Sequence, residues 1–166
     1  MTLPPPNPDR PAHKMVHLPG LALRERAFGE FRRVLFTGLY SQVVTMEVPV
    51  GGEIGDEVHT VDQVLIFTAG AGLATVAGEK RPIEAGDVVI VPAGTQHQFE
   101  TRGERPLELV TVYSPAEHAP TTVHRDKAEG DKAEDEGRDE APEWSRKAKK
   151  ENEEAGLVRL SGKYDD

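Results

Sequence analysis

The sequence predicts an all-β domain of the sandwich or barrel type, carrying an extended arm and a charged tail. Between Phe31 and Pro115, short runs rich in aliphatic, aromatic and β-branched residues are separated by glycine, proline or acidic turn residues. This spacing is typical of antiparallel sandwiches and barrels. No segment of this region has the period of a long helix. With 166 residues, 37% of them hydrophobic, the chain can bury one modest core.

The N-terminal residues, 1–27, are expected to form a proline-rich arm. Four of residues 4–8 are proline, which removes backbone donors and favours extended, unpaired chain. The β-domain is expected over residues 28–124. Its strands are predicted within residues 31–38, 41–50, 63–70, 72–78, 86–94, 97–103 and 106–115.

The C-terminal tail, residues 125–166, is predicted to be mostly disordered or loosely helical. It is a mixed-charge run with a single tryptophan, Trp144, and few aliphatic residues, so it lacks an apolar face to offset its ordering entropy. We therefore expect the barrel to fold without residues 128–166. The alternative is that Trp144 and the segment Gly156–Gly162 dock onto a partner or a second subunit.

Composition and charge exclude several classes of function. The net charge of −9 argues against nucleic acid or an anionic membrane as the main partner, since both require a basic patch. The absence of cysteine excludes disulfides, thiolate metal sites and a cysteine nucleophile, so a metal must be held by nitrogen and oxygen. No apolar run is long enough for a signal peptide or a membrane span, so we expect a cytoplasmic protein.

The segment from Gly51 to Gly72 places polar residues directly before an apolar strand. Residues two apart on a strand share a face, so Glu57 and His59 point the same way, as does Gln63 if the strand is unbroken. Leu65 and Phe67 follow on that face and are expected to line the apolar interior. Farther along, His97 follows a Pro-x-Gly turn.

These two segments resemble the two motifs of the cupin superfamily. The first motif, G-x5-H-x-H-x3,4-E-x6-G, aligns with Gly51, Glu57, His59, Gln63 and Gly70, and the second, G-x5-P-x-G-x2-H-x3-N, with Gly86, Pro92, Gly94, His97 and Thr101. Every spacing fits. The identities differ at Glu57, Gln63 and Thr101, where the family has histidine, glutamate and asparagine.

The resemblance extends over residues 31–124 and implies a fold and a cofactor. The Asp62-Gln63 pair that follows His59, together with the flanking segments, is similar to a group of small single-domain bacterial cupins. The implied fold is the double-stranded β-helix, or jelly-roll barrel. The implied cofactor is a divalent metal ion, Mn, Fe, Zn, Co or Ni, bound by Glu57, His59, Gln63 and His97.

The substitutions leave one carboxylate in the implied site and reduce its imidazoles from three to two. Glu57, His59 and His97 then form a set of two histidines and one carboxylate, which non-haem iron(II) oxygenases use, and the Gln63 amide oxygen is a weak fourth ligand. The alternative is a decayed site, in which Glu57 faces solvent, Gln63 is satisfied by backbone groups and His97 is a buried, hydrogen-bonded histidine. Asp62 competes as a ligand, but its strand parity points outward.

The other four histidines are expected to lie at the surface: His13, His17, His118 and His124. The first two lie four apart, but prolines at positions 11 and 19 argue against a helix that would pair them. His118 and His124 follow the last predicted strand and open the charged tail.

Three functions are compatible with the sequence. The first is a metal-dependent, oxygenase-like enzyme that acts on a small organic molecule inside the barrel. The second is a non-catalytic cupin that binds a small molecule. The third is a sugar-phosphate isomerase of the mannose-6-phosphate isomerase type, for which the phosphate ligands would come from Lys80, Arg81, Arg102 and Arg105.

A homodimer is also expected, formed through the outer face of the barrel. A small barrel has no helical layer over its outer strand surface, and Val34, Phe36, Val44 and Met46 are candidates for that surface. The arm could then reach across to the partner.

Overall fold

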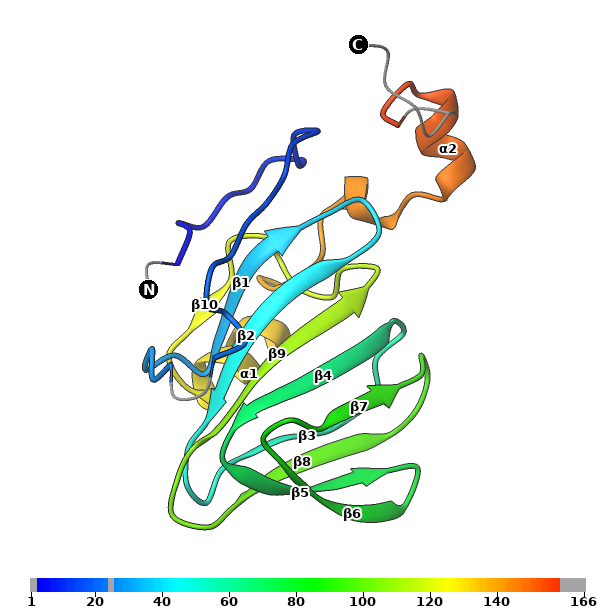
Figure 1. Cartoon of the computed structure of the whole chain (residues 1–166). Helices are drawn as coiled ribbons and strands as arrows, with labels where there is room; N and C mark the ends of the chain where they lie inside the picture. The colour runs from blue at the N-terminus through cyan, green and yellow to red at the C-terminus, as the bar shows by residue number, and fades with distance from the viewer. Residues whose placement is uncertain (1–2, 24–25, 159–166) are drawn as a thin grey trace.

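The computed structural model describes residues 3–23 and 26–158. Among these residues, ten strands form two antiparallel sheets, with orders β10-β1-β2-β9-β4-β7 and β3-β8-β5-β6. The two sheets face each other as a barrel (Figure 1). The strands are β1 Arg32–Thr37, β2 Gln42–Val48, β3 Glu53–Glu57, β4 Asp62–Ala69, β5 Ala71–Val76, β6 Glu79–Glu84, β7 Val88–Val91, β8 His97–Arg102, β9 Leu107–Ser114 and β10 Val123–His124.

The core lies between the two sheets and follows the alternation of the strands. In β4, Leu65 and Phe67 are buried as predicted, and they pack with Phe99 of β8 and Leu109 of β9. Thr101, at the asparagine position of the second motif, donates its hydroxyl to the carbonyl of Val48. The all-β jelly-roll prediction is therefore confirmed. Over residues 3–23 and 26–158, no helix is long and apolar enough to cross a bilayer.

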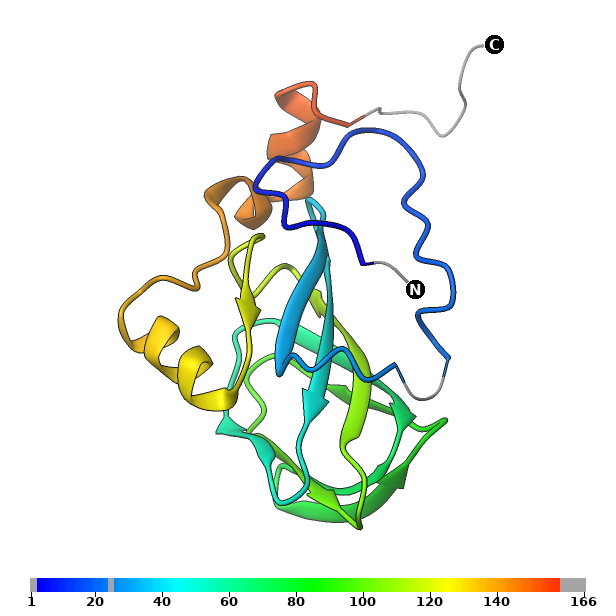
Figure 2. The same ribbon diagram turned by 90° about the vertical axis from the view of Figure 1, so that its left-hand side faces the viewer.

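The N-terminal arm has no strand or helix over residues 3–23 and runs beside the barrel (Figures 1 and 2). His13 and His17 are exposed, as predicted. The base of the arm is fixed to the outer face of the large sheet. There Arg26 donates to Thr68 Oγ1 at 3.1 Å and to the carbonyl of Leu109 at 3.0 Å, and the backbone N–H of Ala27 donates to Glu108.

The described part of the tail contains three short helical segments and packs on the barrel. It contains α1 Lys127–Asp135, the 3-10 turn η1 Glu143–Arg146 and α2 Lys149–Glu154, and α1 lies beside β10 (Figure 2). Lys127 donates to the carbonyl of Gly55 on β3 at 2.9 Å. The helix thus joins the β10 edge of one sheet to the β3 edge of the other. The proposed docking segment, Gly156–Gly162, lies largely outside the described residues.

The tail has no broad apolar face, as expected, but it buries several small and polar side chains. Ala133, Ser145 and Asn152 are all buried, and Gly130 lies so close to the barrel that a Cβ atom there would be 3.0 Å from Arg32 Nη1. Asp139, 4% exposed, accepts from His118 Nδ1 at 2.7 Å, from the Ala119 N–H at 3.1 Å and from the Thr122 hydroxyl. Small and polar side chains with specific partners replace the apolar face that the composition lacks.

We predict that Asp139→Ala lowers the free energy of unfolding by about 1–3 kcal/mol, because it leaves buried donors of the barrel without an acceptor. Urea denaturation measures the change. Asp131→Ala, an exposed acid of α1, is the matched control and should unfold as the wild type does. Equal stability of the two variants would show that the hydrogen bonds of Asp139 contribute nothing to the stability of the fold.

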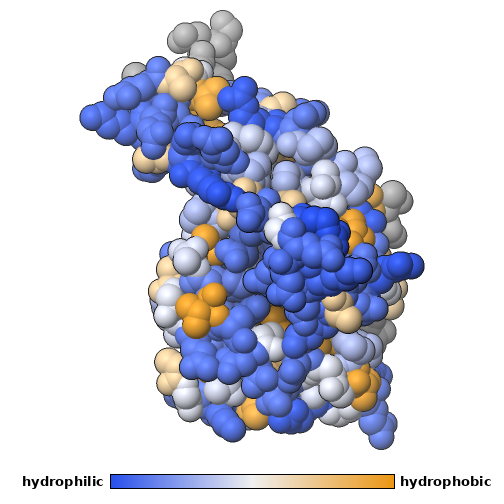
Figure 3. Space-filling model, turned by 180° about the vertical axis from the view of Figure 1, so that it is seen from behind, coloured by the Kyte–Doolittle hydropathy of each residue, from blue (hydrophilic) through white to orange (hydrophobic). Residues whose placement is uncertain are grey.

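Most of the residues that we predicted for a dimer surface are not on the outer face of the barrel. Val34, Val44 and Met46 belong to the core, with 3%, 0% and 0% of their surface exposed, because their strand positions point inward. Val88 and Ile90 of β7 are 56% and 62% exposed. They lie opposite Ile66 and Val64 of β4. The opposite side of the molecule from Figure 1 is mainly hydrophilic (Figure 3).

The homodimer stays a prediction, but the outer apolar residues of β7 and β4 replace the predicted residues of β1 and β2 as its candidate interface. If this apolar strip on β7 and β4 pairs two copies, light scattering at micromolar concentration should give about twice the chain mass of 18.2 kDa. Ile90→Lys should then return the mass to that of one chain. A wild-type mass of one chain would end the prediction.

Candidate metal centre

Glu57 and His97 are placed by the pairing of β3 with β8. The register sets Glu57 opposite His97, with a bulge between Gly55 and Glu57. A bulge changes the direction in which the following side chain points. Gly55 has φ +82°, and a Cβ atom there would lie 2.6 Å from the carbonyl oxygen of His97. The close approach of the two strands therefore requires glycine at this position.

His59 lies just after β3, in the connection to β4. Its carbonyl accepts from the N–H of Gly94 at 2.7 Å, so the turn of the second motif holds the backbone of the first. Asp62 is exposed and accepts from the N–H of Ala93 at 2.8 Å. The prediction that Asp62 points outward is confirmed.

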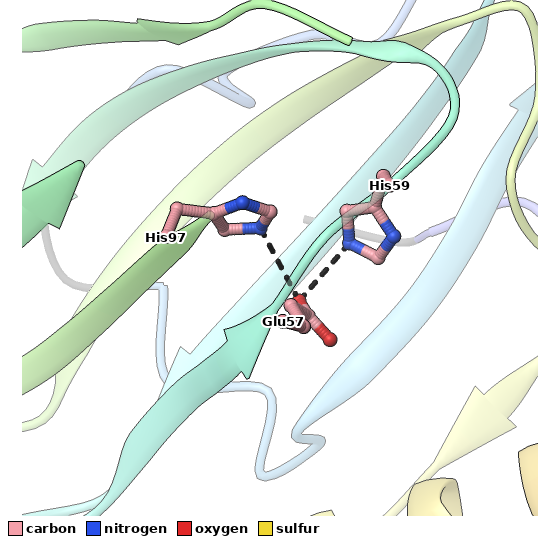
Figure 4. A group of neighbouring side chains, drawn as sticks. All are labelled: Glu57, His59 and His97. Carbon is pink, nitrogen blue, oxygen red and sulfur yellow. Dashed lines mark hydrogen bonds and ion pairs between the residues drawn. The ribbon is translucent and has the colours of Figure 1, made fainter. Parts of the chain in front are cut away.

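Glu57, His59 and His97 come together, with one ligand atom of each within 4.8 Å of the others. Glu57 Oε1 lies 3.0 Å from His59 Nε2 and 3.5 Å from His97 Nε2 (Figure 4). The second distance is too long for a good hydrogen bond. Both imidazoles thus turn the same nitrogen toward one carboxylate.

The other nitrogen of each imidazole is engaged elsewhere. His97 Nδ1 donates to the carbonyl of Thr95 at 2.9 Å, and His59 Nδ1 donates to Glu117 Oε1 at 3.0 Å. Hydrogen bonds of this kind fix the tautomer of a metal-binding histidine and leave Nε2 for the metal.

Two buried polar atoms support a metal at this place. Within the described part of the chain, His97 Nε2 and Gln63 Oε1 are buried and have no hydrogen-bond partner. A lone pair that is buried without a partner is costly, and a divalent cation is a suitable partner for both. The residues present therefore fit a divalent metal, whose identity this donor set does not determine.

Gln63 joins the group indirectly. It is fully buried, and its Nε2 donates to Thr111 Oγ1 at 3.0 Å and to the Tyr113 hydroxyl at 3.3 Å. Tyr113 in turn packs edge-on against His59, with ring centroids 5.7 Å apart. These contacts orient the amide and leave its oxygen free. The role of Gln63 as a fourth ligand stays a prediction.

The three charged groups shift each other's protonation. Burial acts to raise the pKa of Glu57, but the hydrogen bond with His59 and the imidazole of His97, 3.5 Å away, outweigh it and lower the pKa well below its usual value. Burial acts to lower the pKa of His59, but hydrogen bonds to Glu117 and Glu57 outweigh it and raise the pKa to about 9. In the metal-free protein, His59 is therefore a cation between two carboxylates at neutral pH.

Comparison with known proteins agrees with this architecture. A family model described as the cupin domain matches residues 44–113. The solved structure of BH2720 from Bacillus halodurans is 32% identical, with a TM-score of 0.68 over 74% of this chain and 96% of that chain. The chain belongs to the cupin superfamily.

Two curated proteins are similar to parts of this cupin. The uncharacterized protein YrkC of Bacillus subtilis is 38% identical over 112 residues, which span 63% of this chain and 60% of YrkC. The acireductone dioxygenase of Geobacillus thermodenitrificans is 36% identical over 62 residues, or 34% of each chain. The cupin thus spans less than two thirds of either protein.

Sequence reasoning missed several polar residues beside the centre. The surface prediction is wrong for His118 and His124, which are 6% and 5% exposed. His118 binds Asp139, and His124 Nδ1 lies 3.1 Å from Arg32 Nη1. Burial, followed by the charge of Arg32, lowers the pKa of both histidines. Their partners are far away in the sequence, so no local pattern indicates them.

Glu117 was missed for the same reason. It lies 58 residues after His59 and outside both motifs. The signal available was its place in the segment after the last strand of the barrel, which resembles the corresponding segment of small bacterial cupins.

We predict that metal affinity rises with pH up to about 9, the pKa of His59 in the metal-free protein. Binding requires neutral imidazole, so each metal ion displaces one proton and the affinity should gain about tenfold per pH unit below that value. Competition titrations of Co²⁺ against a chelator between pH 6.5 and 8.5 measure the slope. A flat profile would contradict the protonated state of His59.

The stability of the metal-free fold changes with pH in the opposite direction to the metal affinity. Because the pKa of His59 is raised above its ordinary value of about 6.5, its ion pairs stabilise the metal-free fold fully below that pH. The contribution is lost as the pH rises through about 9.

Proposed function

We propose that this cupin binds one divalent metal ion through Glu57, His59 and His97 and uses it to oxidise a small organic molecule. The observation that carries the proposal is the convergence of the three ligand atoms within 4.8 Å, with the Nδ1 atom of each histidine already engaged. Two imidazoles and one carboxylate are the ligand set of non-haem iron(II) oxygenases. The set also suits Mn²⁺, Co²⁺, Ni²⁺ and Zn²⁺.

The surroundings of the centre support a reaction in a site with little water. His97 packs against Phe99, with ring centroids 6.1 Å apart, and Phe99 packs against Phe67. These rings, with Leu65, form the apolar interior. When bound, the ion would supply Lewis-acid chemistry and, as iron, redox chemistry toward oxygen.

Solvent reaches the centre at its two carboxylates. The side chains of Glu57 and Glu117 are 25% and 24% exposed, whereas that of His97 is fully buried. A hollow of about 540 Å³ lies beside Glu117, which lines it together with Thr60, Val61, Glu134, Ala141 and Arg146. A small molecule bound in this hollow would approach the centre past Glu117.

Within the interior, the protein's own groups would bind and orient that molecule. Burial raises the pKa of the Tyr113 phenol, so its hydroxyl stays protonated, and Gln63 donates to its oxygen. Tyr113 therefore has a proton to donate to an oxygen atom of a ligand. The similarity to an acireductone dioxygenase makes an enediol ketone the first substrate to try.

The isomerase receives less support from the structure. Arg81 and Arg102 are paired with Glu79 and Glu100 on exposed parts of their strands. Among the described residues, neither arginine forms an ion pair or a hydrogen bond with Glu57, His59 or His97. A non-catalytic binding protein shares the metal centre and differs only in the absence of turnover.

We predict that purified protein loaded with Fe²⁺ or Co²⁺ holds one ion per chain. His97→Ala should weaken binding by more than the approximately 10–100-fold that the loss of an outer hydrogen-bond partner costs, because it removes a ligand. Gln63→Ala should weaken binding less. Elemental analysis after desalting measures the content, and circular dichroism checks that both variants are folded.

Oxygen uptake then separates enzyme from binding protein. The iron-loaded protein should consume oxygen with an enediol ketone, and His97→Ala should not. Equal metal content in the wild type and in folded His97→Ala would sink the assignment of the centre, whereas metal binding without turnover of any enediol or hydroxy acid would favour the binding protein.

A further inference from the structure

Glu117 is a carboxylate beside the centre that is not among its three ligands. It lies in the connection between β9 and β10 and touches His59 from the side opposite Glu57, with Oε1 3.0 Å from His59 Nδ1. The His59 imidazole is therefore held between two carboxylates, since Glu57 Oε1 lies 3.0 Å from Nε2.

The backbone that carries Glu117 is fixed by a buried side chain. Gln42 of β2 is fully buried, and its Oε1 accepts from the N–H groups of Glu117 at 3.2 Å and His118 at 3.0 Å. Its Nε2 donates to the His118 carbonyl at 2.8 Å and to Thr37 Oγ1 at 3.0 Å. Three hydrogen bonds thus hold residues 117 and 118 against the barrel wall, so the carboxylate of Glu117 is held in place by the fold.

The two imidazoles of the centre differ in their partners. His97 Nδ1 donates to a neutral backbone carbonyl, whereas His59 Nδ1 donates to a carboxylate. A carboxylate partner makes an imidazole a stronger electron donor and restricts the rotation of its ring. The backbone of His59 is also less restrained than that of His97, because His59 lies in a connection whereas His97 lies in strand β8.

The charge of Glu117 has a second effect. Glu57 alone leaves a divalent ion with one positive charge in excess inside a barrel of low dielectric constant. Glu117 supplies the second negative charge one imidazole away, where it balances the ion without occupying a coordination position. Positions on the metal thus remain open for a ligand.

We infer that Glu117 is a positioning residue of the metal centre: held by Gln42, it fixes the ring of His59 with Nε2 toward the metal and raises the affinity for a divalent ion. This inference rests on the proposed metal centre.

The test uses Co²⁺ with the full-length protein and three variants. Glu117→Ala removes both the acceptor and the charge, and Glu117→Gln keeps an acceptor oxygen but removes the charge. Glu140→Gln removes the same charge from the lining of the same hollow, at a residue that is not a hydrogen-bond partner of His59, and so controls for the general electrostatic field. Competition with a chelator gives the dissociation constants, and the visible absorption of bound Co²⁺ reports the geometry of its ligands.

Glu117→Ala should weaken Co²⁺ binding by about 10–100-fold and change the visible spectrum. Glu117→Gln should fall between Glu117→Ala and the wild type with a spectrum closer to the wild type, and Glu140→Gln should match the wild type in both. A residue with a merely structural role would lower the melting temperature without changing the spectrum.

Other results would overturn either the inference about Glu117 or the proposed metal centre itself. Wild-type affinity in both Glu117 variants, with Co²⁺ bound at one ion per chain, would overturn the inference and leave the proposed function standing. No binding of Co²⁺ or Fe²⁺ by the wild type would overturn both. If Glu117→Ala does not fold, Glu117→Gln decides: an unchanged affinity and spectrum in that variant overturn the inference.

Discussion

The pairing of β3 with β8 is the constraint on which the centre depends. β3 is an edge strand of five residues, and its register against β8 sets Glu57 opposite His97. Its backbone comes so close to β8 that only glycine fits at position 55. Because side chains alternate along a strand, a shift of one residue in this register would turn Glu57 out of the barrel. The position of two of the proposed metal ligands is thus a consequence of the pairing within the smaller sheet.

The tail secures the edge that this pairing leaves open. β3 has no strand partner on its outer side, and Lys127 donates to its Gly55 carbonyl. Farther along, Asp139 accepts a hydrogen bond from His118, the neighbour of Glu117. Burial acts to raise the pKa of Asp139, but the hydrogen bonds from His118 and Thr122 outweigh it and lower the pKa. A segment that looks like a solvated appendage therefore supports the loop beside the centre. This explains why a chain with a modest core keeps so many buried polar side chains.

The arrangement of side chains in the metal-free protein already suits the proposed metal. Without metal, a proton on His59 occupies the place between the imidazole and Glu57 and satisfies both. The Glu117 carboxylate accepts from Nδ1 whether a proton or a metal sits at Nε2. The ligands are consequently held near their binding positions in advance, which limits the reorganisation that binding requires. The cost is competition between metal and proton.

The sequence by itself determined the barrel and the inward face of β4, and it indicated Glu57, His59 and His97, which the structure brings together; the role of Gln63 as a ligand stays a prediction. Strand alternation and motif spacing are local, so they can be read along the chain. Only the tertiary structure decided that Glu117 faces His59, that Asp139 and His118 pair, and that Val44 and Met46 belong to the core and not to an outer face. These contacts join residues from 21 to 58 positions apart, or depend on which side of a strand faces the second sheet. A two-residue period reveals that a strand has two faces, but which of them is buried is settled when the sheets pack.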